Sequence, residues 1–379
     1  MSKREGETQG ENTPKKQTIE KKPVRVWADG CFDMMHFGHA NALRQARALG
    51  DYLVVGVHSD EEIRKHKGPP VMSERERYLA VAACKWVDEV VEAAPYVTEV
   101  DMLEKYNIDF CAHGDDLVTS ADGEDTYHKV KAAGKFRVFK RTEGVSTTDL
   151  VGRMLLLTKE HHKENHIHRF DGQRLGDMSS GSNSSPYTTV SHFLPSSKRI
   201  VQFAEGREPK PTDKVVYIDG IFDLFHVGHI ETLKKAKELG DYLLVGVYDD
   251  KLANRLKGSN YPIMNLHERT LGVLSCKYVD EVIIGAPYKL SKEMIQGKIH
   301  VLVHGTCADA RDGDIPSEDP YAVAKELGIY QTIDSPNNIT SSNIIERIIS
   351  NRMSFEARNK KKEEKEAKEF QELSTKTEK

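Results

Sequence analysis

The sequence lacks four features that would have assigned it to other classes of protein. Its 379 residues contain no apolar run long enough for a membrane-spanning helix, and they begin with a polar, charged segment rather than a leader. The five cysteines show no close CxxC spacing, which favours a reducing, cytoplasmic compartment over a disulfide scaffold. The 55 lysines and arginines nearly balance the 59 aspartates and glutamates, so no basic surface for nucleic acid is expected.

The sequence does contain a long internal repeat. Residues 27–60, WADGCFDMMHFGHANALRQARALGDYLVVGVHSD, align without gaps with residues 217–250, YIDGIFDLFHVGHIETLKKAKELGDYLLVGVYDD. A unit of this length exceeds a solenoid repeat, so each copy should be a whole domain with its own core. We therefore expect a disordered tail at 1–22, a first domain at 23–157, a linker at 158–212, a second domain at 213–353 and a charged helical tail at 354–379.

Strand and helix patterns alternate through the first copy. Such alternation predicts an α/β domain in which a mainly parallel sheet has helices on both faces. The apolar patterns predict strands at Val24–Ala28, Tyr52–Val57, Glu89–Glu92, Asp109–Ala112 and Phe136–Phe139. They predict helices at His39–Leu49 and Glu74–Trp86.

The segments outside the repeat have a different composition. The linker is rich in His, Ser, Gly, Asn and Pro, although Thr188–Phe193 and Arg199–Phe203 carry apolar residues that would let them dock on a domain. Its histidines lack a Cys or carboxylate constellation, which favours solvated polar sequence over a metal cluster; they are His161, His162, His166 and His168. The run Arg358–Leu373 mixes both charges without a wide apolar face and predicts a solvated helix.

The repeat carries one short motif twice, His36-Phe37-Gly38-His39 and His226-Val227-Gly228-His229, each after an apolar strand and at the start of a helical pattern. Histidines three residues apart in a first turn share the face to which the unpaired backbone N–H groups point. The glycine lets phosphate oxygens approach the backbone. Each preorganised donor at a phosphoryl group in transfer is worth on the order of 3–4 kcal/mol. Because the motif recurs with its context intact, we favour a phosphate site over an ordinary helix start.

Four ordered motifs together resemble the cytidylyltransferase family: GxFDxxHxGH, Lys67-Gly68, the ERxxxxxxCKxVDEV segment, and RTEGVSTT at Arg141–Thr148. Members of that family join CTP to a phosphoalcohol and release pyrophosphate. The resemblance covers nearly all of both copies and implies two tandem Rossmann-like nucleotidyltransferase domains, with Mg²⁺ accompanying the triphosphate. Lys85 and Lys277 depart from the family pattern, which has arginine there, so a planar bidentate contact is in doubt.

By this resemblance, four residues of the first domain would carry the chemistry: His36, His39, Lys67 and Arg141. The histidines would stabilise the pentavalent α-phosphate, Lys67 would reach the phosphates, and Arg141 would hold the triphosphate. Nucleotide-binding residues in the first domain would be Ala28, Asp29, Phe32, Asp33, His113, Gly114, Asp115, Asp116, Thr142, Ser146, Thr147 and Thr148. Those in the second would be Ile218, Asp219, His226, Val227, Gly228, His229, Lys257, His304, Gly305, Thr306, Cys307, Ser335, Asn337, Asn338 and Thr340. For the hydroxyls of Ser146–Thr148, helix capping is as good an interpretation as phosphate contact, and the sequence places no metal ligands.

The two halves differ at the later motifs. RTEGVSTT becomes SPNNITSS at Ser335–Ser342, without the arginine and glycine, and the HGDD that begins at His113 becomes HGTC from His304. Without this arginine, the second domain should stabilise the transition state of a reacting triphosphate less well, by several kcal/mol. We therefore expect the first domain to carry most of the chemistry, and the second to bind cytidine nucleotide and support or regulate the first.

The resemblance also bears on the acceptor. A duplicated catalytic domain without a long amphipathic membrane-binding region resembles family members that use ethanolamine phosphate, in phosphatidylethanolamine synthesis, rather than choline phosphate. A primary ammonium needs acceptors and choline needs an aromatic cage; Trp86, Tyr78 and Asp33 are compatible with either.

A choline-phosphate or other phosphoalcohol enzyme stays open as an alternative, as does a non-catalytic nucleotide sensor. The absence of a KMSKS-like loop and of a basic surface disfavours an ATP-using synthetase. A homodimer and peripheral association with the endoplasmic reticulum are compatible with the sequence.

Overall fold

The computed structural model describes residues 22–116, 118–120, 122–142, 145–156, 195–204, 207–307, 316–360 and 364. The expected N-terminal tail, the histidine-rich part of the linker with Thr188–Phe193, and most of the C-terminal tail lie outside these residues.

The first domain is built on a parallel sheet with the strand order β3-β2-β1-β4-β5. Its central strand β1 pairs with β2 on one side and with β4 on the other, so the strand order reverses beside β1. In open α/β sheets, ligands bind at the carboxyl ends of the strands beside such a switch point. The strands are β1 (Arg25–Gly30), β2 (Tyr52–Val57), β3 (Glu89–Glu92), β4 (Phe110–Gly114) and β5 (Phe136–Phe139). The helices are α1 (Phe37–Arg47), α2 (Asp60–His66), α3 (Glu74–Ala82), α4 (Val100–Lys105), α5 (His128–Ala132) and α6 (Thr147–Leu156).

The second domain repeats this topology, with the strand order β10-β9-β6-β7-β8. The two parallel sheets confirm the predicted tandem α/β architecture. The strands are β6 (Val215–Gly220), β7 (Tyr242–Val247), β8 (Glu281–Ile284), β9 (Val301–Gly305) and β10 (Tyr330–Ile333). The helices are α7 (Pro195–Phe203), α8 (Val227–Lys237), α9 (Asp250–Lys257), α10 (Leu266–Leu274), α11 (Lys292–Ile295), α12 (Ala322–Glu326) and α13 (Ser341–Ser350). Residues 352–360 form a further helical segment after α13.

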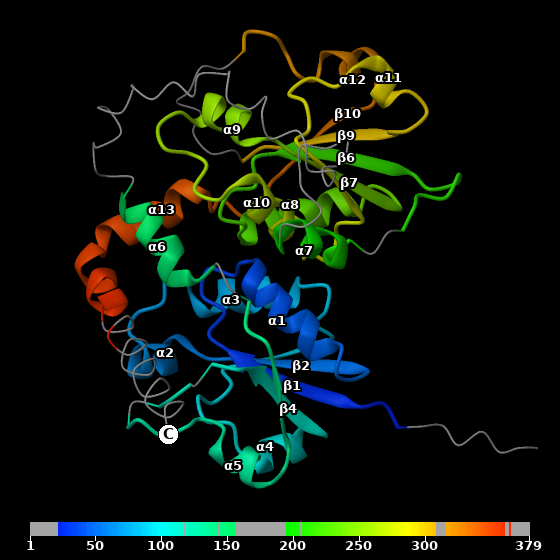
Figure 1. Cartoon of the computed structure of the whole chain (residues 1–379). Coiled ribbons are helices and arrows are strands. Elements are labelled where there is room, and N and C mark those ends of the chain that lie inside the picture. The colour runs from blue at the N-terminus through cyan, green and yellow to red at the C-terminus, as the bar shows by residue number, and fades with distance from the viewer. Residues whose placement is uncertain are drawn as a thin grey trace, which may run out of the picture.

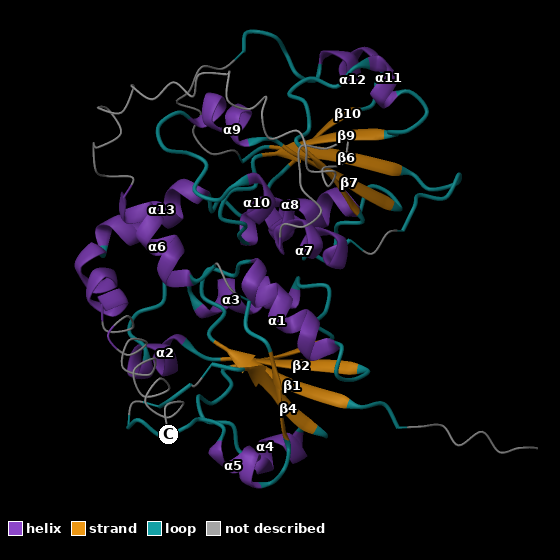
Figure 2. Cartoon of the chain, in the orientation of Figure 1, coloured by secondary structure: helices purple, strands orange, loops and turns teal. Residues whose placement is uncertain are grey.

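The two domains pack against each other through equivalent faces. Helices α1, α3, α8 and α10 lie between the two sheets (Figures 1 and 2), with α1 against α10 and α3 against α8. Phe37, Ala40 and Val145 of the first domain belong to the same buried apolar cluster as the core of the second. An apolar cluster of the second domain therefore continues across the interface into the first.

A short antiparallel pairing joins the domains at their centre. Cys84 lies opposite Cys276, and the amides on either side donate across the interface, Lys85 N to Ser275 O at 2.9 Å and Lys277 N to Ala83 O at 2.8 Å. This pairing explains why α3 ends at Ala82 and not at Trp86 as predicted: the following backbone is used to pair with the other domain. Helix α1 starts two residues earlier than predicted, because His36 caps it.

The lysines that depart from the family pattern also lie at this interface. Lys85 Nζ donates to the carbonyl of Phe203, and Lys277 Nζ donates to that of Ala82 at 2.7 Å. Phe203 is fully buried and packs edge-on against Trp86, with ring centroids 4.7 Å apart. The end of the predicted linker, as α7, therefore docks on the interface, and Trp86 lies there rather than in an acceptor pocket.

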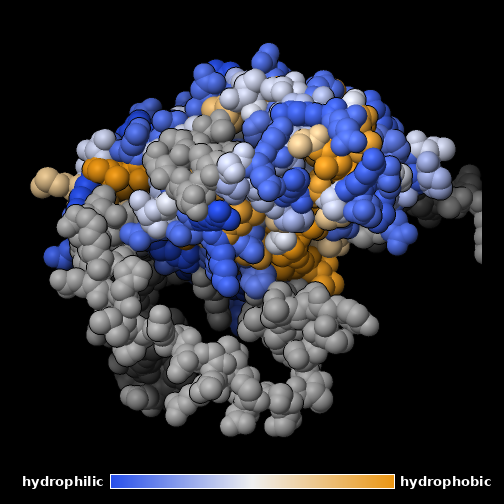
Figure 3. Space-filling model, turned by 90° about the horizontal axis from the view of Figure 1, so that it is seen from above, coloured by the Kyte–Doolittle hydropathy of each residue, from blue (hydrophilic) through white to orange (hydrophobic). Residues whose placement is uncertain are grey.

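Two ion pairs close the interface symmetrically. Arg153 of α6 contacts both carboxylate oxygens of Glu268 at 2.9 and 3.0 Å, and Arg347 of α13 contacts those of Glu76 at 2.8 and 2.9 Å. Each pair joins the last helix of one domain to the capping-box glutamate of a helix in the other. Seen from above, the surface is mainly hydrophilic (Figure 3), and no helix among the described residues is long and apolar enough to cross a membrane.

Replacing Arg153 by alanine tests how much one of these pairs contributes. Glu268 is 7 % exposed, so Arg153→Ala leaves a buried carboxylate without its cation and should lower the free energy of unfolding by about 2 kcal/mol. Arg64→Ala removes an exposed pair with Asp60 at 3.8 Å and should cost less than about 1 kcal/mol. Urea unfolding of both variants measures the difference, and equal effects would contradict this view of the interface.

Candidate active site

The two histidines of the first-domain motif are held in one tautomer by the start of helix α1. His36 Nδ1 accepts the N–H of Gly38 at 3.1 Å, and His39 Nδ1 accepts the N–H of His36 at 3.3 Å. Because each Nδ1 acts as an acceptor, the proton of a neutral ring resides on Nε2. The rings stack with centroids 3.9 Å apart. The motif thus provides two adjacent Nε2–H donors at the switch point of the sheet, which suits a phosphoryl group that gains negative charge.

Neither histidine motif has room for a side chain at the position of its glycine. A Cβ on Gly38 would lie 2.8 Å from His36 Cε1 and 2.9 Å from Val145 Cγ1. A Cβ on Gly228 would lie 2.5 Å from the carbonyl oxygen of Ile339, which is backbone and cannot move aside easily. Glycine therefore lets the next segment of each domain pass close to its histidine pair.

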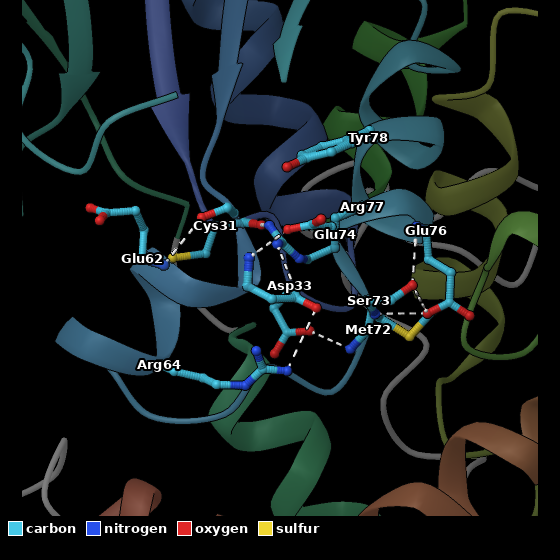
Figure 4. Close-up of polar contacts among 12 residues, drawn as sticks. Cys31, Asp33, Glu62, Arg64, Met72, Ser73, Glu74, Glu76, Arg77 and Tyr78 are labelled. Carbon is cyan, nitrogen blue, oxygen red and sulfur yellow. Dashed lines mark hydrogen bonds and ion pairs between the residues drawn. The ribbon is translucent and has the colours of Figure 1, made fainter. Parts of the chain in front are cut away.

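The turn between β1 and α1 directs Asp33 inward. Phe32 and Met34 both have left-handed φ angles, 49° and 48°, which are strained for side chains of this size. The Asp33 carboxylate accepts the N–H groups of Val71 at 3.0 Å and of Met72 at 2.9 Å (Figure 4). Asp33, expected to border the nucleotide, thus holds the loop after Lys67 instead of lining an acceptor pocket.

Lys67 of the first domain and the equivalent Lys257 of the second differ in exposure. Lys67 is exposed at the end of α2, with Nζ 5.7 Å from the centre of the Tyr96 ring. The charge of Cys31, followed by Tyr96, raises the pKa of Lys67, so the ammonium stays charged at neutral pH. Lys257 is 4 % exposed and lies over Tyr261, 4.6 Å from its ring centre.

Asp29 is the centre of a buried polar cluster at the end of β1. Its carboxylate accepts Trp27 Nε1–H at 3.0 Å and the hydroxyl protons of Thr98 and Tyr127. In the second domain, Tyr321 donates to Asp219 at 3.0 Å. Sequence reasoning missed both tyrosines, although Tyr127 and Tyr321 each stand two residues after an aspartate in the two copies.

Tyr78, a candidate for the acceptor pocket, lies elsewhere. It belongs to the core of the first domain, and its hydroxyl accepts the N–H of Ala93 at 3.2 Å. Tyr78 is thus packed in the core of the first domain, and Trp86 lies at the interface between the domains.

The last two motifs of the first domain meet at the ends of β4 and β5. The Arg141 N–H donates to Asp115 at 2.9 Å, and its guanidinium lies 3.6 Å from Asp116. Both partners of that ion pair are more than one-third exposed, so a triphosphate can compete for the guanidinium. Thr142 Oγ1 accepts from Asn41 at 2.8 Å, a partner that sequence reasoning missed because it lies 101 residues away.

The hydroxyls that follow Arg141 have structural partners. Ser146 Oγ accepts the N–H of Asp149 at 3.1 Å, which is a helix-capping contact. Thr147 Oγ1 donates to the carbonyl of Asp33 at 3.0 Å, and Ser341 makes the same contact to Asp223 at 2.7 Å. Of the two interpretations, capping therefore applies to Ser146, while Thr147 ties α6 to the motif turn.

The second domain contains a cleft of about 920 Å³, including open solvent, at the ends of β6 and β9. Most of the residues expected at this site line it: Ile218, Asp219, His226, Gly228, His229, Lys257, His304, Gly305, Cys307, Ser335, Asn337 and Thr340. Three others do not: Val227 is buried in a core, Thr306 accepts the N–H of Ser335 at 3.0 Å, and Asn338 does not line the cleft. Tyr248, Tyr321 and Thr232 line it without having been expected.

His226 is held differently from His36. It is 5 % exposed and makes no side-chain capping hydrogen bond at the start of α8. Burial, then the charges of His229, Lys257 and Arg347, lower the pKa of His226 well below its usual value. His226 therefore lacks the Nδ1 contact that orients His36, whereas His229 is held as His39 is, its Nδ1 accepting the N–H of His226 at 3.4 Å.

The comparisons with known proteins show the family of the chain. Residues 27–153 and 217–347 both match the family described as cytidylyltransferase-like, and the chain belongs to this family. Over most of its length it is similar to ethanolamine-phosphate cytidylyltransferases. It is 58 % identical to the enzyme of Dictyostelium discoideum (92 % of this chain, 97 % of that one) and 52 % identical to that of Mus musculus (90 % of each). Choline-phosphate cytidylyltransferase A of Rattus norvegicus is 49 % identical over 35 % of this chain and 37 % of its own length.

A glycine substitution tests the close approach in the second domain. Gly228→Ala should destabilise the chain by about 2 kcal/mol, because a methyl group against the Ile339 carbonyl forces a backbone shift. Gly152→Ala is the matched control: it lies in helix α6 with nothing within 4 Å of its new Cβ, and should be neutral or stabilise by up to about 1 kcal/mol. Thermal unfolding compares them, and a neutral Gly228→Ala variant would contradict the packing described.

Asp223 predicts a pH dependence of stability. Burial raises its pKa from 3.8 to about 6, despite hydrogen bonds from the N–H groups of Ile263 and Met264. The folded state therefore binds this proton more tightly than the unfolded chain, so the stabilisation is present at pH 4 and lost as the pH rises through 6. Urea unfolding at several pH values should show that Asp223→Asn removes part of this decline. An unchanged slope would mean that Asp223 is ionised throughout.

Proposed function

We propose that this chain transfers the cytidylyl group of CTP to ethanolamine phosphate, giving CDP-ethanolamine and pyrophosphate, a step in phosphatidylethanolamine synthesis. The observation that carries the proposal is the pair of oriented imidazoles, His36 and His39, at the switch point of the first sheet. The similarity to ethanolamine-phosphate cytidylyltransferases through both domains supports the choice of substrates.

In the proposed reaction, a phosphate oxygen of ethanolamine phosphate attacks the α-phosphorus of CTP. The bond from that phosphorus to the oxygen that bridges the α- and β-phosphates breaks, and pyrophosphate leaves. His36 and His39 would donate through Nε2 to the equatorial oxygens, where negative charge increases. Lys67 and Arg141 would hold the β- and γ-phosphates, and no covalent enzyme intermediate is required.

Magnesium would enter with the triphosphate. Among the residues the structure describes, no three His, Cys, Asp or Glu side chains are grouped closely enough to hold a metal ion. Mg²⁺ commonly takes most of its ligands from phosphate oxygens and water. A metal bound chiefly through CTP therefore fits the residues present, with Asp115 and Asp116 as the nearest acidic side chains to Arg141.

The proposed acceptor site is centred on Asp29. A primary ammonium needs anionic or carbonyl acceptors, and Asp29 is a buried carboxylate at the end of β1, beside Tyr127. Tyr96 is close enough to Asp29 for that charge to contribute to its raised pKa, and its ring centre lies 5.7 Å from Nζ of Lys67, near which the phosphates would lie. This arrangement favours ethanolamine phosphate over choline phosphate, which would need a cage of aromatic faces. Since the product serves membrane lipid synthesis, we place the enzyme in the cytoplasm, acting close to the endoplasmic reticulum.

The second domain is proposed to bind cytidine nucleotide without carrying the main reaction. The backbone arrangement of the first domain is kept, since Ser335 N–H donates to Thr306 as Arg141 N–H does to Asp115. The guanidinium and the carboxylates are gone, and His226 lacks the contact that orients His36. The cleft can therefore hold a nucleotide but lacks charge for a triphosphate in transfer.

Pyrophosphate release from CTP tests both proposals. With ethanolamine phosphate as acceptor, His36→Ala should lower kcat by about 10²–10³-fold, because one preorganised donor is lost. His226→Ala, the matched change in the second domain, should lower it by less than about tenfold. Choline phosphate, assayed in parallel, should react poorly. Full activity in His36→Ala together with loss in His226→Ala would assign the reaction to the second domain. No turnover with either acceptor in the wild type would leave the nucleotide-sensor alternative.

A further inference from the structure

The helical segment 352–360, which follows the second domain, reaches the first domain. Arg358 Nη1 lies 2.8 Å from the carbonyl of Pro69 and 3.4 Å from the carboxylate of Asp33, and its side chain is 14 % exposed. We had expected a solvated helix here, and that expectation is wrong for Arg358. Phe355, one turn earlier, is 3 % exposed and belongs to one apolar cluster with Val71 and Met72. The segment is thus anchored on the first domain by packing as well as by charge.

The loop that Arg358 touches joins Lys67 to helix α3. Asp33 holds its far end through the N–H groups of Val71 and Met72, and Arg358 holds its middle through Pro69. Gly68 also lies against Arg358, since a Cβ there would be 3.5 Å from Arg358 Cγ. Asp33 itself stands three residues before His36. One guanidinium therefore contacts both the loop next to Lys67 and the turn that leads into the histidine motif.

The second domain shows the same loop without this contact. Asp223 accepts the N–H groups of Ile263 and Met264, as Asp33 does from Val71 and Met72. Within the described residues, no arginine hydrogen-bonds to Asp223. Burial raises the pKa of both aspartates, and in each case nearby cations act in the opposite direction: Arg358 and Arg77 at Asp33, Arg269 and Lys257 at Asp223. The two copies thus differ in a cation that comes from outside the repeat.

We propose that Arg358 is a positioning residue for the reaction of the first domain. It fixes the Lys67–Met72 loop against Asp33, so that Lys67 is presented to the phosphates of CTP. The second domain thereby completes the site of the first by supplying the helix that carries Arg358. This inference rests on the proposed function, because the role of the loop is defined by CTP.

Full-length Arg358→Ala protein tests the inference against Arg352→Ala as control. Arg352 lies on the same segment but, within the described part of the chain, hydrogen-bonds only to Glu356, at 2.7 Å, and both side chains are at least 40 % exposed. In Arg358→Ala, kcat/KM for CTP should fall about tenfold, the effect of losing one charge-assisted hydrogen bond. The KM for ethanolamine phosphate should not change. Arg358→Lys should recover part of the loss, since its ammonium keeps the charge and the donors but lies on a shorter side chain and is not planar.

Hydrogen exchange gives a readout that needs no turnover. The amides of Val71 and Met72 should exchange faster in Arg358→Ala than in the wild type or in Arg352→Ala. Faster exchange with the selective loss in CTP kinetics supports the inference. Unchanged exchange, or an equal loss for both substrates and in the control, overturns it. If the wild type shows no turnover, the proposed function fails while exchange still decides whether Arg358 fixes the loop. If Arg358→Ala does not fold, Arg358→Lys decides by the same two measurements.

Discussion

The burial of one domain face against its own duplicate is the constraint on which the rest of the structure depends. The antiparallel pairing of Cys84 with Cys276 places the ends of α3 and α10 against each other, and each supplies an amide to the other domain. Helices α1 and α8, which begin with the histidine motifs, are packed in the same layer. The start of each motif helix is therefore fixed by the interface as well as by its own sheet. Since the apolar cluster is continuous across both domains, neither copy can reorient alone without exposing core residues.

This symmetry explains which features the duplication had to keep. Both copies retain the left-handed turn residues, the inward aspartate, and the hydroxyl of the last helix that donates to the aspartate carbonyl. These contacts hold the strand-to-helix turn in shape and do not depend on a ligand. The features that diverged are exposed charges, such as Arg141 and Asp116, whose ion pair contributes little to stability. The residues that hold the fold are therefore kept in the second copy, whereas its exposed charged residues differ from those of the first.

Much of this could be predicted because it is local. The strands at Tyr52–Val57 and Glu89–Glu92 have the predicted bounds. A short apolar run between turn residues is sufficient to define the buried strand β2 and the part-buried edge strand β3. The histidine pair follows from spacing and context alone. Contacts between distant segments could not be predicted: the end of α3 depends on Ser275, the partner of Thr142 is Asn41, and Trp86 packs on Phe203. An amphipathic pattern predicts which residues are buried, but it does not predict which distant segment of the chain packs on them.

The C-terminal helical segment shows the limit of that reasoning most clearly. A run of mixed charges has no wide apolar face, so its composition favours solvent, yet one aromatic and one arginine are enough to anchor it on the other domain. Because this segment follows the second copy, its counterpart after the first copy would be the start of the interdomain linker. The pseudo-symmetry of the fold therefore ends where the repeat ends, and an asymmetric contact can only be added from these flanking segments. Such a contact gives the two copies different active-site loops while their shared interface stays symmetric. On the proposed function, this contact would let a second domain with weakened chemistry act on the reaction of the first.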